Sequence, residues 1–151
     1  MTRIEIPFAT LKTANDQMTK PANEWIYERG EGRTKHCWSE PFAGFKPGQR
    51  GQIGKCSNKI TDAVATKLLN NGINDAGEQV GREERGDYPS KIYTVHDGAI
   101  YVAVPTCPGI SYHGYPVRGR LPRKLVEKLR QKARDSDCLR EFEKWVREYI
   151  E

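Results

Sequence analysis

The sequence predicts an α+β fold in which a small antiparallel sheet is covered by helices. A β-rich hairpin over 91–104 and a third β-rich run near 110–115 indicate the sheet. Helical spacing of apolar side chains recurs in three segments, near 58–70, 122–134 and 137–150. The chain has 151 residues, which suits one domain with a buried core, so we expect a single domain over 1–151.

The first third of the chain carries the weakest signals. Phe8 and Leu11 stand at helical spacing and predict a first helix, and a second short helix is predicted over 24–27. Residues 30–55 are rich in glycine and proline and show no sustained period, so we expect a long loop there. Three aromatic residues argue against disorder of this loop, and we expect each to be at least partly buried: Trp38, Phe42 and Phe45.

The next helix is predicted to begin at Ser57 or Asn58, because either side chain can cap a helix N-terminus. Its apolar row includes Ile60, Val64 and Leu68. Residues 70–72 read Asn-Asn-Gly, which tolerates the left-handed backbone that ends helices. The polar segment 74–90 is expected to be an exposed connection.

The hairpin is the strongest local prediction, because Asp97-Gly98 suits a two-residue type I′ turn. That turn pairs Val95 with Ile100 and Tyr93 with Val102, which makes one face apolar. The other face carries Thr94, His96, Tyr101 and Ala103. Two prolines, Pro105 and Pro108, are expected to break the chain before the third strand.

Two helices are predicted at the C-terminal end. Pro122 suits the first turn of a helix whose apolar stripe comprises Leu125, Val126, Leu129 and Ala133. A last helix is expected from Ser136 or Asp137, with a buried side of Leu139, Phe142, Val146 and Tyr149.

Positive charge is concentrated in two blocks. The net charge is +5, and residues 29–59 hold seven basic and two acidic side chains, while residues 117–134 hold eight basic and one acidic. A focused basic patch attracts polyanions, so nucleic acid is the expected partner, RNA in preference to DNA. The longest apolar run, 99–104, is far shorter than the roughly 20 residues that cross a bilayer. We therefore expect a soluble, cytoplasmic protein with no membrane partner.

Residues 111–120 combine side chains that suit chemistry on RNA. Metal-free cleavage of RNA needs a base, an acid and cations on the phosphate. The candidate catalytic residues are His113, with His96 as a second proton-transfer group, and Tyr112. The candidate nucleic-acid-binding residues supply phosphate contacts and a stacking ring: Lys55, Arg118, Arg120, Arg123, Lys124 and Tyr115.

A different chemistry is suggested by Cys56, which stands before the predicted helix and beside Lys55. A helix N-terminus and a lysine both favour the thiolate, and a downstream histidine would complete a Cys/His hydrolase. The order of Cys56, His96 and His113 resembles the cell-wall amidase and endopeptidase branch of the papain-like fold. This resemblance covers the Cys-Ser helix start and the residue order. It departs from the family's pattern because the strand around His96 does not continue as the family's His-x-Gly strand.

The sequence also contains candidate ligands for a metal ion. His36, Cys37 and Cys56, with Cys107 or Cys138, could bind zinc across the long loop, but structural zinc sites usually contain a short ligand pair. The sequence has no such pair and no nucleotide-binding glycine loop, so we expect neither a metal nor a cofactor. The four cysteines are expected to be reduced thiols.

These observations give one leading hypothesis with two alternatives. The leading hypothesis is a small, metal-independent ribonuclease of the toxin or defence type, for which an inhibitory protein partner is expected. The alternatives are a non-catalytic nucleic-acid-binding module and a Cys/His hydrolase with Cys56 as the nucleophile.

Overall fold

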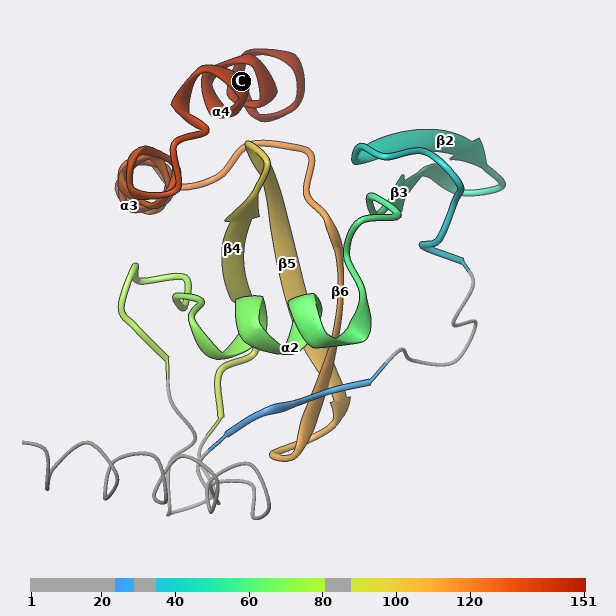
Figure 1. The fold of residues 1–151 in the computed structure, drawn as a ribbon, viewed down its shortest axis with the longest axis vertical. Helices are drawn as coiled ribbons and strands as arrows, with labels where there is room; N and C mark the ends of the chain where they lie inside the picture. Colours follow the sequence, from blue (N-terminus) through green and yellow to red (C-terminus); the bar gives the residue numbers. More distant parts are fainter. Residues whose placement is uncertain (1–23, 29–34, 81–87) are drawn as a thin grey trace, which may run out of the picture.

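The computed structural model describes residues 24–28, 35–80 and 88–151 (Figure 1). The fold is α+β, as the sequence predicts. The strands are β1 (Ile26–Tyr27), β2 (Gly44–Gly48), β3 (Gly51–Lys55), β4 (Ile92–His96), β5 (Ala99–Cys107) and β6 (Ser111–Pro116). The helices are α2 (Asp62–Asn70), α3 (Arg123–Asp135) and α4 (Leu139–Trp145), and α4 continues as the π-helical turn η2 (Val146–Ile150). The helix predicted around Phe8 and Leu11 lies outside the described residues.

The main sheet has four strands in the order β1-β6-β5-β4. The predicted hairpin is confirmed in its register, with Val95 opposite Ile100 and Tyr93 opposite Val102. Its turn has positive φ at both central residues, 50° at Asp97 and 86° at Gly98, as a type I′ turn requires. Strand β6 adds to β5 in antiparallel fashion, which confirms the third predicted strand.

The short helix predicted over 24–27 is wrong, because these residues form the edge of the sheet. Ile26 and Tyr27 pair in parallel with Ser111 and Tyr112 of β6. Trp25 is 1% exposed and packs edge-on against the Tyr112 ring. Burial of this tryptophan in the tertiary structure therefore outweighs the local sequence pattern that predicts a helix.

The predicted break at Pro105 is also wrong, because β5 continues to Cys107. The pairing with β6 shifts between Pro105 and Cys107. A bulge of this kind accommodates a proline, which has no N–H to give to the ladder.

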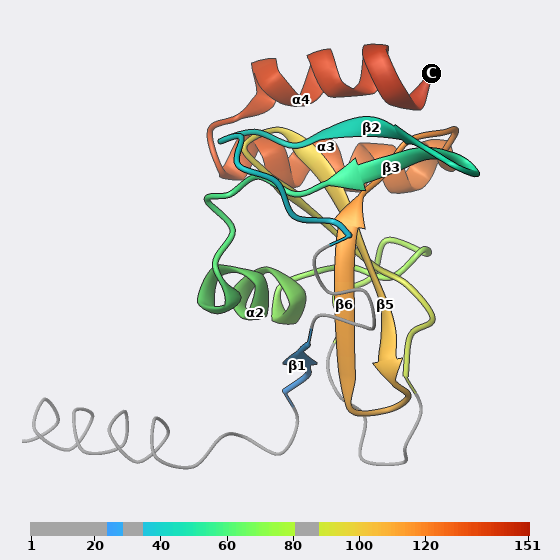
Figure 2. The ribbon, with the colours of Figure 1, turned by 90° about the vertical axis from the view of Figure 1, so that its right-hand side faces the viewer.

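The long loop predicted over 30–55 is wrong for residues 44–55, which form the β2–β3 hairpin. Gly48 pairs with Gly51, so Gln49 and Arg50 make the turn. The glycines that hide the strand pattern serve close packing: a Cβ on Gly54 would lie 3.0 Å from both Cδ and the carbonyl oxygen of Pro116. The hairpin thereby approaches the end of β6, beside α4 (Figure 2).

Two of the three aromatic residues expected to be partly buried are so. Trp38 and Phe45 are half-buried, but Phe42 is 56% exposed, so the prediction is wrong for Phe42. The Phe42 ring packs edge-on against Trp38, and the Phe42 carbonyl accepts a 2.9 Å hydrogen bond from the Trp38 indole. Phe45 instead contacts Trp145 and Tyr149 of the C-terminal helix.

Helix α2 begins at Asp62, not at Ser57 or Asn58, because Thr61 is the cap that accepts a hydrogen bond from the Val64 amide. Ser57 is buried, and its amide donates to the Tyr101 hydroxyl. The helix ends at Asn70, as residues 70–72 predict, but the expected left-handed backbone is wrong, because neither Asn71 nor Gly72 has positive φ. In the described part of the chain, no helix is both long and apolar enough to cross a membrane.

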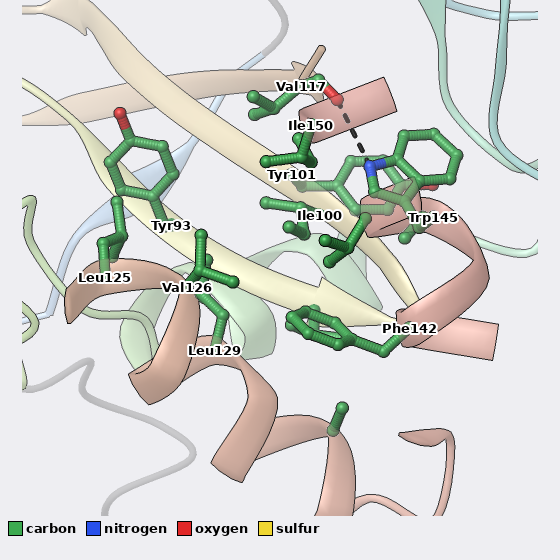
Figure 3. Close-up of a cluster of buried hydrophobic side chains, with 14 of the residues drawn as sticks. Tyr93, Ile100, Tyr101, Val117, Leu125, Val126, Leu129, Phe142, Trp145 and Ile150 are labelled. Atoms are coloured by element: carbon green, nitrogen blue, oxygen red, sulfur yellow. Dashed lines mark hydrogen bonds between the residues drawn. The ribbon is translucent and has the colours of Figure 1, made fainter. Parts of the chain in front are cut away.

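Helices cover both faces of the sheet. On one side, the predicted stripe of α3 and Phe142 of α4 gather over Ile100 of β5 (Figure 3). The Trp145 indole donates a 3.3 Å hydrogen bond to the Val117 carbonyl, which fixes α4 to the segment after β6. On the other side, Leu69 of α2 packs with a second buried cluster of Trp25, Val80, Ile92 and Tyr112.

Candidate functional site

An open groove lies where the β2–β3 hairpin faces the uncovered part of the sheet. Its volume is about 1070 Å³. Its floor comes from β4, β5 and β6, through Tyr93, Val102, Val104, His113 and Tyr115. Its walls come from the hairpin and from the chain at and after the end of β6, through Pro116, Val117, Arg118, Arg120 and Leu121.

The lining of this groove is cationic. The charged side chains among its described lining residues are Lys35, Arg50, Lys91, Arg118 and Arg120, and no carboxylate is among them. The Arg118 guanidinium lies over the Phe45 ring at 5.4 Å, a cation–π contact that positions it at the groove wall. Low-dielectric walls focus such a field, so the groove favours an anionic ligand.

His113 lies on β6 with its side chain in the groove lining. Its Nδ1 is 2.7 Å from Oγ1 of Thr106, and that hydroxyl donates a 3.2 Å hydrogen bond to the Glu28 carbonyl. Partial burial lowers the pKa of His113 below its usual value, because burial disfavours the charged ring. His113 is therefore a positioned histidine beside a set of cations.

His36, which the sequence suggests only as a zinc ligand, also lines the groove. Its Nδ1 is 2.7 Å from the Gly54 carbonyl oxygen, and its ring stacks on Tyr115 at 5.0 Å with a 19° interplanar angle. The backbone is held too, since the Cys56 amide donates to the His36 carbonyl. Burial lowers the pKa of His36, the hydrogen bond to the Gly54 carbonyl opposes this shift, and the charges of Lys35, His113 and Lys55 add to it.

Two predicted catalytic residues lie away from the groove. His96 stands at the turn end of β4, with its Nδ1 3.8 Å from an Asp97 carboxylate oxygen. Tyr112 points to the opposite face of the sheet and is 0% exposed. Its hydroxyl donates a 2.5 Å hydrogen bond to the Pro89 carbonyl, and burial raises its pKa to about 12. Neither residue shares a surface with His113.

The predicted nucleic-acid-binding residues divide in the same way. Tyr115, Arg118 and Arg120 line the groove. Arg123 lines a separate hollow with the end of η2, and Lys124 is exposed on α3. Lys55 donates a 2.5 Å hydrogen bond to the Lys35 carbonyl, so it fixes the segment that carries His36.

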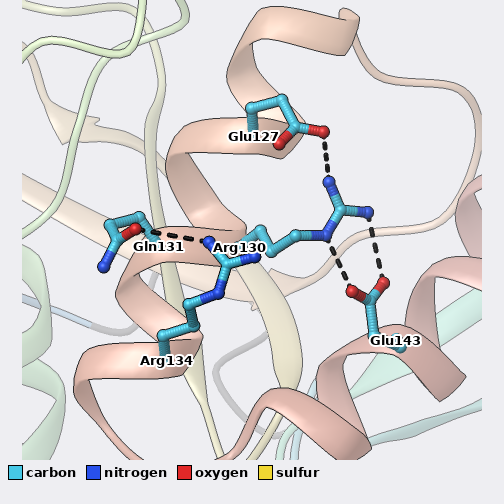
Figure 4. Close-up of polar contacts among 5 residues, drawn as sticks. All are labelled: Glu127, Arg130, Gln131, Arg134 and Glu143. Atoms are coloured by element: carbon cyan, nitrogen blue, oxygen red, sulfur yellow. Dashed lines mark hydrogen bonds and ion pairs between the residues drawn. The ribbon is translucent and has the colours of Figure 1, made fainter.

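Some cations of the second basic block, residues 117–134, bond to other groups of the protein. Arg130 of α3 donates to both carboxylate oxygens of Glu143 on α4, at 2.8 and 3.2 Å, and also contacts Glu127 (Figure 4). Lys132 donates a 2.6 Å hydrogen bond to the Asn71 carbonyl. The cations at the start of this block, before α3, are therefore the ones that shape the groove.

Cys56 does not stand at a helix N-terminus, since α2 begins only at Asp62. Its thiol lies 3.7 Å from the Gly114 carbonyl oxygen, as a hydrogen-bond donor. The helix effect expected to activate this thiol is thus missing. The zinc hypothesis also lacks a site, because no three His, Cys, Asp or Glu side chains within residues 24–28, 35–80 and 88–151 are grouped to hold a metal ion.

The groove combines cations for phosphates, aromatic rings for bases and imidazoles for proton transfer. Its second histidine was missed because no local pattern joins residue 36 to residue 113. A backbone β-bridge pairs Cys37 with Cys56, and the Gly54 carbonyl oxygen lies 2.7 Å from Nδ1 of His36. These contacts bring residue 36 to the sheet that carries His113. Comparison of the chain with protein-family models, with curated proteins and with solved structures finds no significant match.

Proposed function

We propose that this protein binds RNA in the groove and cleaves it without a metal ion, with His113 as a proton-transfer residue. The observation that carries the proposal is the lining of the groove, which is cationic and free of carboxylates over its described residues. A nucleic-acid backbone presents a regular series of negative charges to such a surface.

The rings in the groove favour unpaired bases. Tyr115 stacks on His36 in the groove, and Phe45 lies under Arg118. Aromatic and guanidinium planes of this kind stack on bases of single-stranded nucleic acid. RNA is the favoured ligand because its 2′-hydroxyl is the nucleophile that metal-free cleavage requires.

A salt titration with matched variants tests the binding step. Arg118 lines the groove, whereas Arg140 is an exposed cation on α4 outside its lining. Loss of one phosphate contact on a single strand reduces the slope of log K against log salt by about 0.7. We expect Arg118→Gln to weaken binding of a single-stranded RNA and to lower this slope, and Arg140→Gln to change neither. Equal effects of both substitutions, or salt-independent binding, would contradict the proposal.

An incubation with RNA in EDTA tests the cleavage step. We expect 2′,3′-cyclic phosphate ends to form in EDTA, and no cleavage of DNA of the same sequence. Salt-dependent binding without cleavage would leave the non-catalytic binding module as the function. A fluorescence titration and product analysis on one protein preparation give both results.

A further inference from the structure

We propose that His36 is the second proton-transfer residue: it takes the proton from the 2′-hydroxyl of RNA while His113 protonates the departing 5′-oxygen. This inference rests on the proposed function and deepens it by assigning the base and the acid. It also replaces His96, the partner expected from the sequence, which lies at the far end of the hairpin.

The two histidines share one wall of the groove. His113 and Tyr115 are two residues apart on β6 and so face the same side of the sheet. The His36 ring stacks on the Tyr115 ring at 5.0 Å. Both His36 and His113 belong to the lining of the groove. In the proposed complex, the groove cations hold the scissile phosphate between the two imidazoles.

The hydrogen bonds of the two rings define which nitrogen carries the proton. The Gly54 carbonyl can only accept, so Nδ1 of His36 is the donor in that 2.7 Å contact. The Thr106 hydroxyl gives its single proton to the Glu28 carbonyl, so Nδ1 of His113 must donate to Oγ1 of Thr106. In both neutral rings the lone pair is then on Nε2, the nitrogen that can exchange a proton with substrate.

The neighbouring charges assign the two roles. Two cations flank His36, since Lys35 precedes it in the chain and Lys55 donates a hydrogen bond to the Lys35 carbonyl. Their charges favour the neutral form of His36, although the hydrogen bond to the Gly54 carbonyl favours the protonated form. The pKa of His113 is lowered by its burial. Among the described residues, the hydrogen bonds of His113 lead through Thr106 to Glu28, whose carboxylate accepts from Ser111. Because the two lysines lie beside His36, we assign the base to His36 and the acid to His113.

The reaction balances without a co-reactant. Nε2 of neutral His36 removes the 2′-hydroxyl proton as O2′ forms a bond to phosphorus. The bond from phosphorus to the 5′-oxygen breaks, and Nε2 of protonated His113 gives its proton to that oxygen. The products are a 2′,3′-cyclic phosphate and a 5′-hydroxyl, while the groove cations stabilise charge on the phosphoryl oxygens.

Matched substitutions separate a catalytic role from a structural one. Asparagine can keep the donor that corresponds to Nδ1 but has no counterpart of Nε2. We expect His36→Asn and His113→Asn each to lower kcat/KM for RNA by about 10²–10⁴-fold, with RNA affinity and melting temperature close to those of the unmodified protein. His96→Asn is the control, and we expect it to keep full cleavage activity.

The pH profile and the leaving group identify the base. We expect a bell-shaped profile of kcat/KM that lacks its acidic limb in His36→Asn and its alkaline limb in His113→Asn. A uridine 3′-(4-nitrophenyl phosphate) releases a phenolate that needs no proton. On this substrate, His113→Asn should approach the activity of the unmodified protein, and His36→Asn should remain defective.

The outcomes distinguish this inference from the proposed function. Full RNA cleavage by His36→Asn would overturn the role of His36 while the proposed ribonuclease stood. Rescue of His36→Asn, and not of His113→Asn, on the aryl ester would overturn the assignment of base and acid. RNA binding without cleavage by the unmodified protein would overturn both the inference and the catalytic part of the proposed function.

Discussion

At the scale of single residues, Gly98 shows how strongly one turn is constrained. Its φ is +86°, a region that favours glycine. A Cβ at this position would also lie 2.3 Å from the Glu141 Cβ and 2.6 Å from the Glu141 carbonyl carbon. The turn of the β4–β5 hairpin therefore packs directly on the backbone of α4. Gly98 serves both the hairpin geometry and the contact between the hairpin and the helix.

This double constraint gives a stability prediction with a matched control. Gly119 also has positive φ, +101°, but nothing lies within 4 Å of a Cβ built there. Left-handed backbone costs about 1–2 kcal/mol for alanine at either position. We expect Gly98→Ala to cost a further ~1–3 kcal/mol, because α4 must move to admit the methyl group. Equal free energies of unfolding for the two variants, from urea denaturation, would contradict the close packing.

At the scale of elements, α3 and α4 are joined by a polar clamp as well as by their apolar faces. Arg130 lies over the Phe142 ring at 5.8 Å and makes two hydrogen bonds to the Glu143 carboxylate. These bonds hold the pKa of Glu143 below its usual range. The clamp therefore contributes to stability only while Glu143 is ionised.

The sign of the pH dependence follows from this lowered pKa. The stabilisation is fully present above the unfolded value of about 4.3 and is lost as pH falls through the lowered folded pKa. Because the Glu143 side chain is 37% exposed, we expect Glu143→Gln to cost only about 0.5–1 kcal/mol at neutral pH. The difference in melting temperature from the unmodified protein should shrink at acid pH. The exposed Glu40 serves as the control, and Glu40→Gln should show no such change.

The elements that sequence predicts well are those with local signals. Asp97-Gly98 fixes the hairpin register, and the stripe from Leu125 to Ala133 fixes the buried face of α3. Strand β1 has only two residues, and its partner Ser111 is distant in the chain, so no local pattern could show it. The sequence does not predict the β2–β3 hairpin, because glycine and proline occupy positions where alternating side chains would indicate a strand.

The residues of the candidate site differ in the same way: those close together in the sequence were predicted as a group, and the distant one was not. Tyr115, Arg118 and Arg120 are close in sequence to His113, and the prediction that grouped them matches their common place in the groove. His36 is in the groove because β3 and the preceding segment cross the end of β6, a non-local arrangement. His96 satisfied the alternation of its strand but lies at the opposite end of that strand from the groove residue Lys91.

At the scale of the whole molecule, the groove exists because the β2–β3 hairpin is held against both the sheet and the C-terminal helix (Figure 2). Phe45 is the main link, since its ring contacts Trp145 at 5.7 Å and Tyr149 at 4.8 Å. The same ring lies beneath Arg118. Packing of one side chain thus connects the C-terminal helix to the cationic wall of the groove.

Substitution of this link tests whether the groove depends on it. Phe45 is half-buried among aromatic rings, whereas Phe42 is 56% exposed. We expect Phe45→Ala to cost about 2–3 kcal/mol, somewhat less than the roughly 3–5 kcal/mol for a fully buried phenylalanine, and Phe42→Ala less than about 1 kcal/mol. Urea denaturation measures both values. Phe45→Ala should also weaken RNA binding at temperatures where it remains folded, because Arg118 loses the ring that positions it. Unchanged RNA affinity in a destabilised Phe45→Ala protein would show that RNA binding does not depend on the packing of the β2–β3 hairpin against the C-terminal helix.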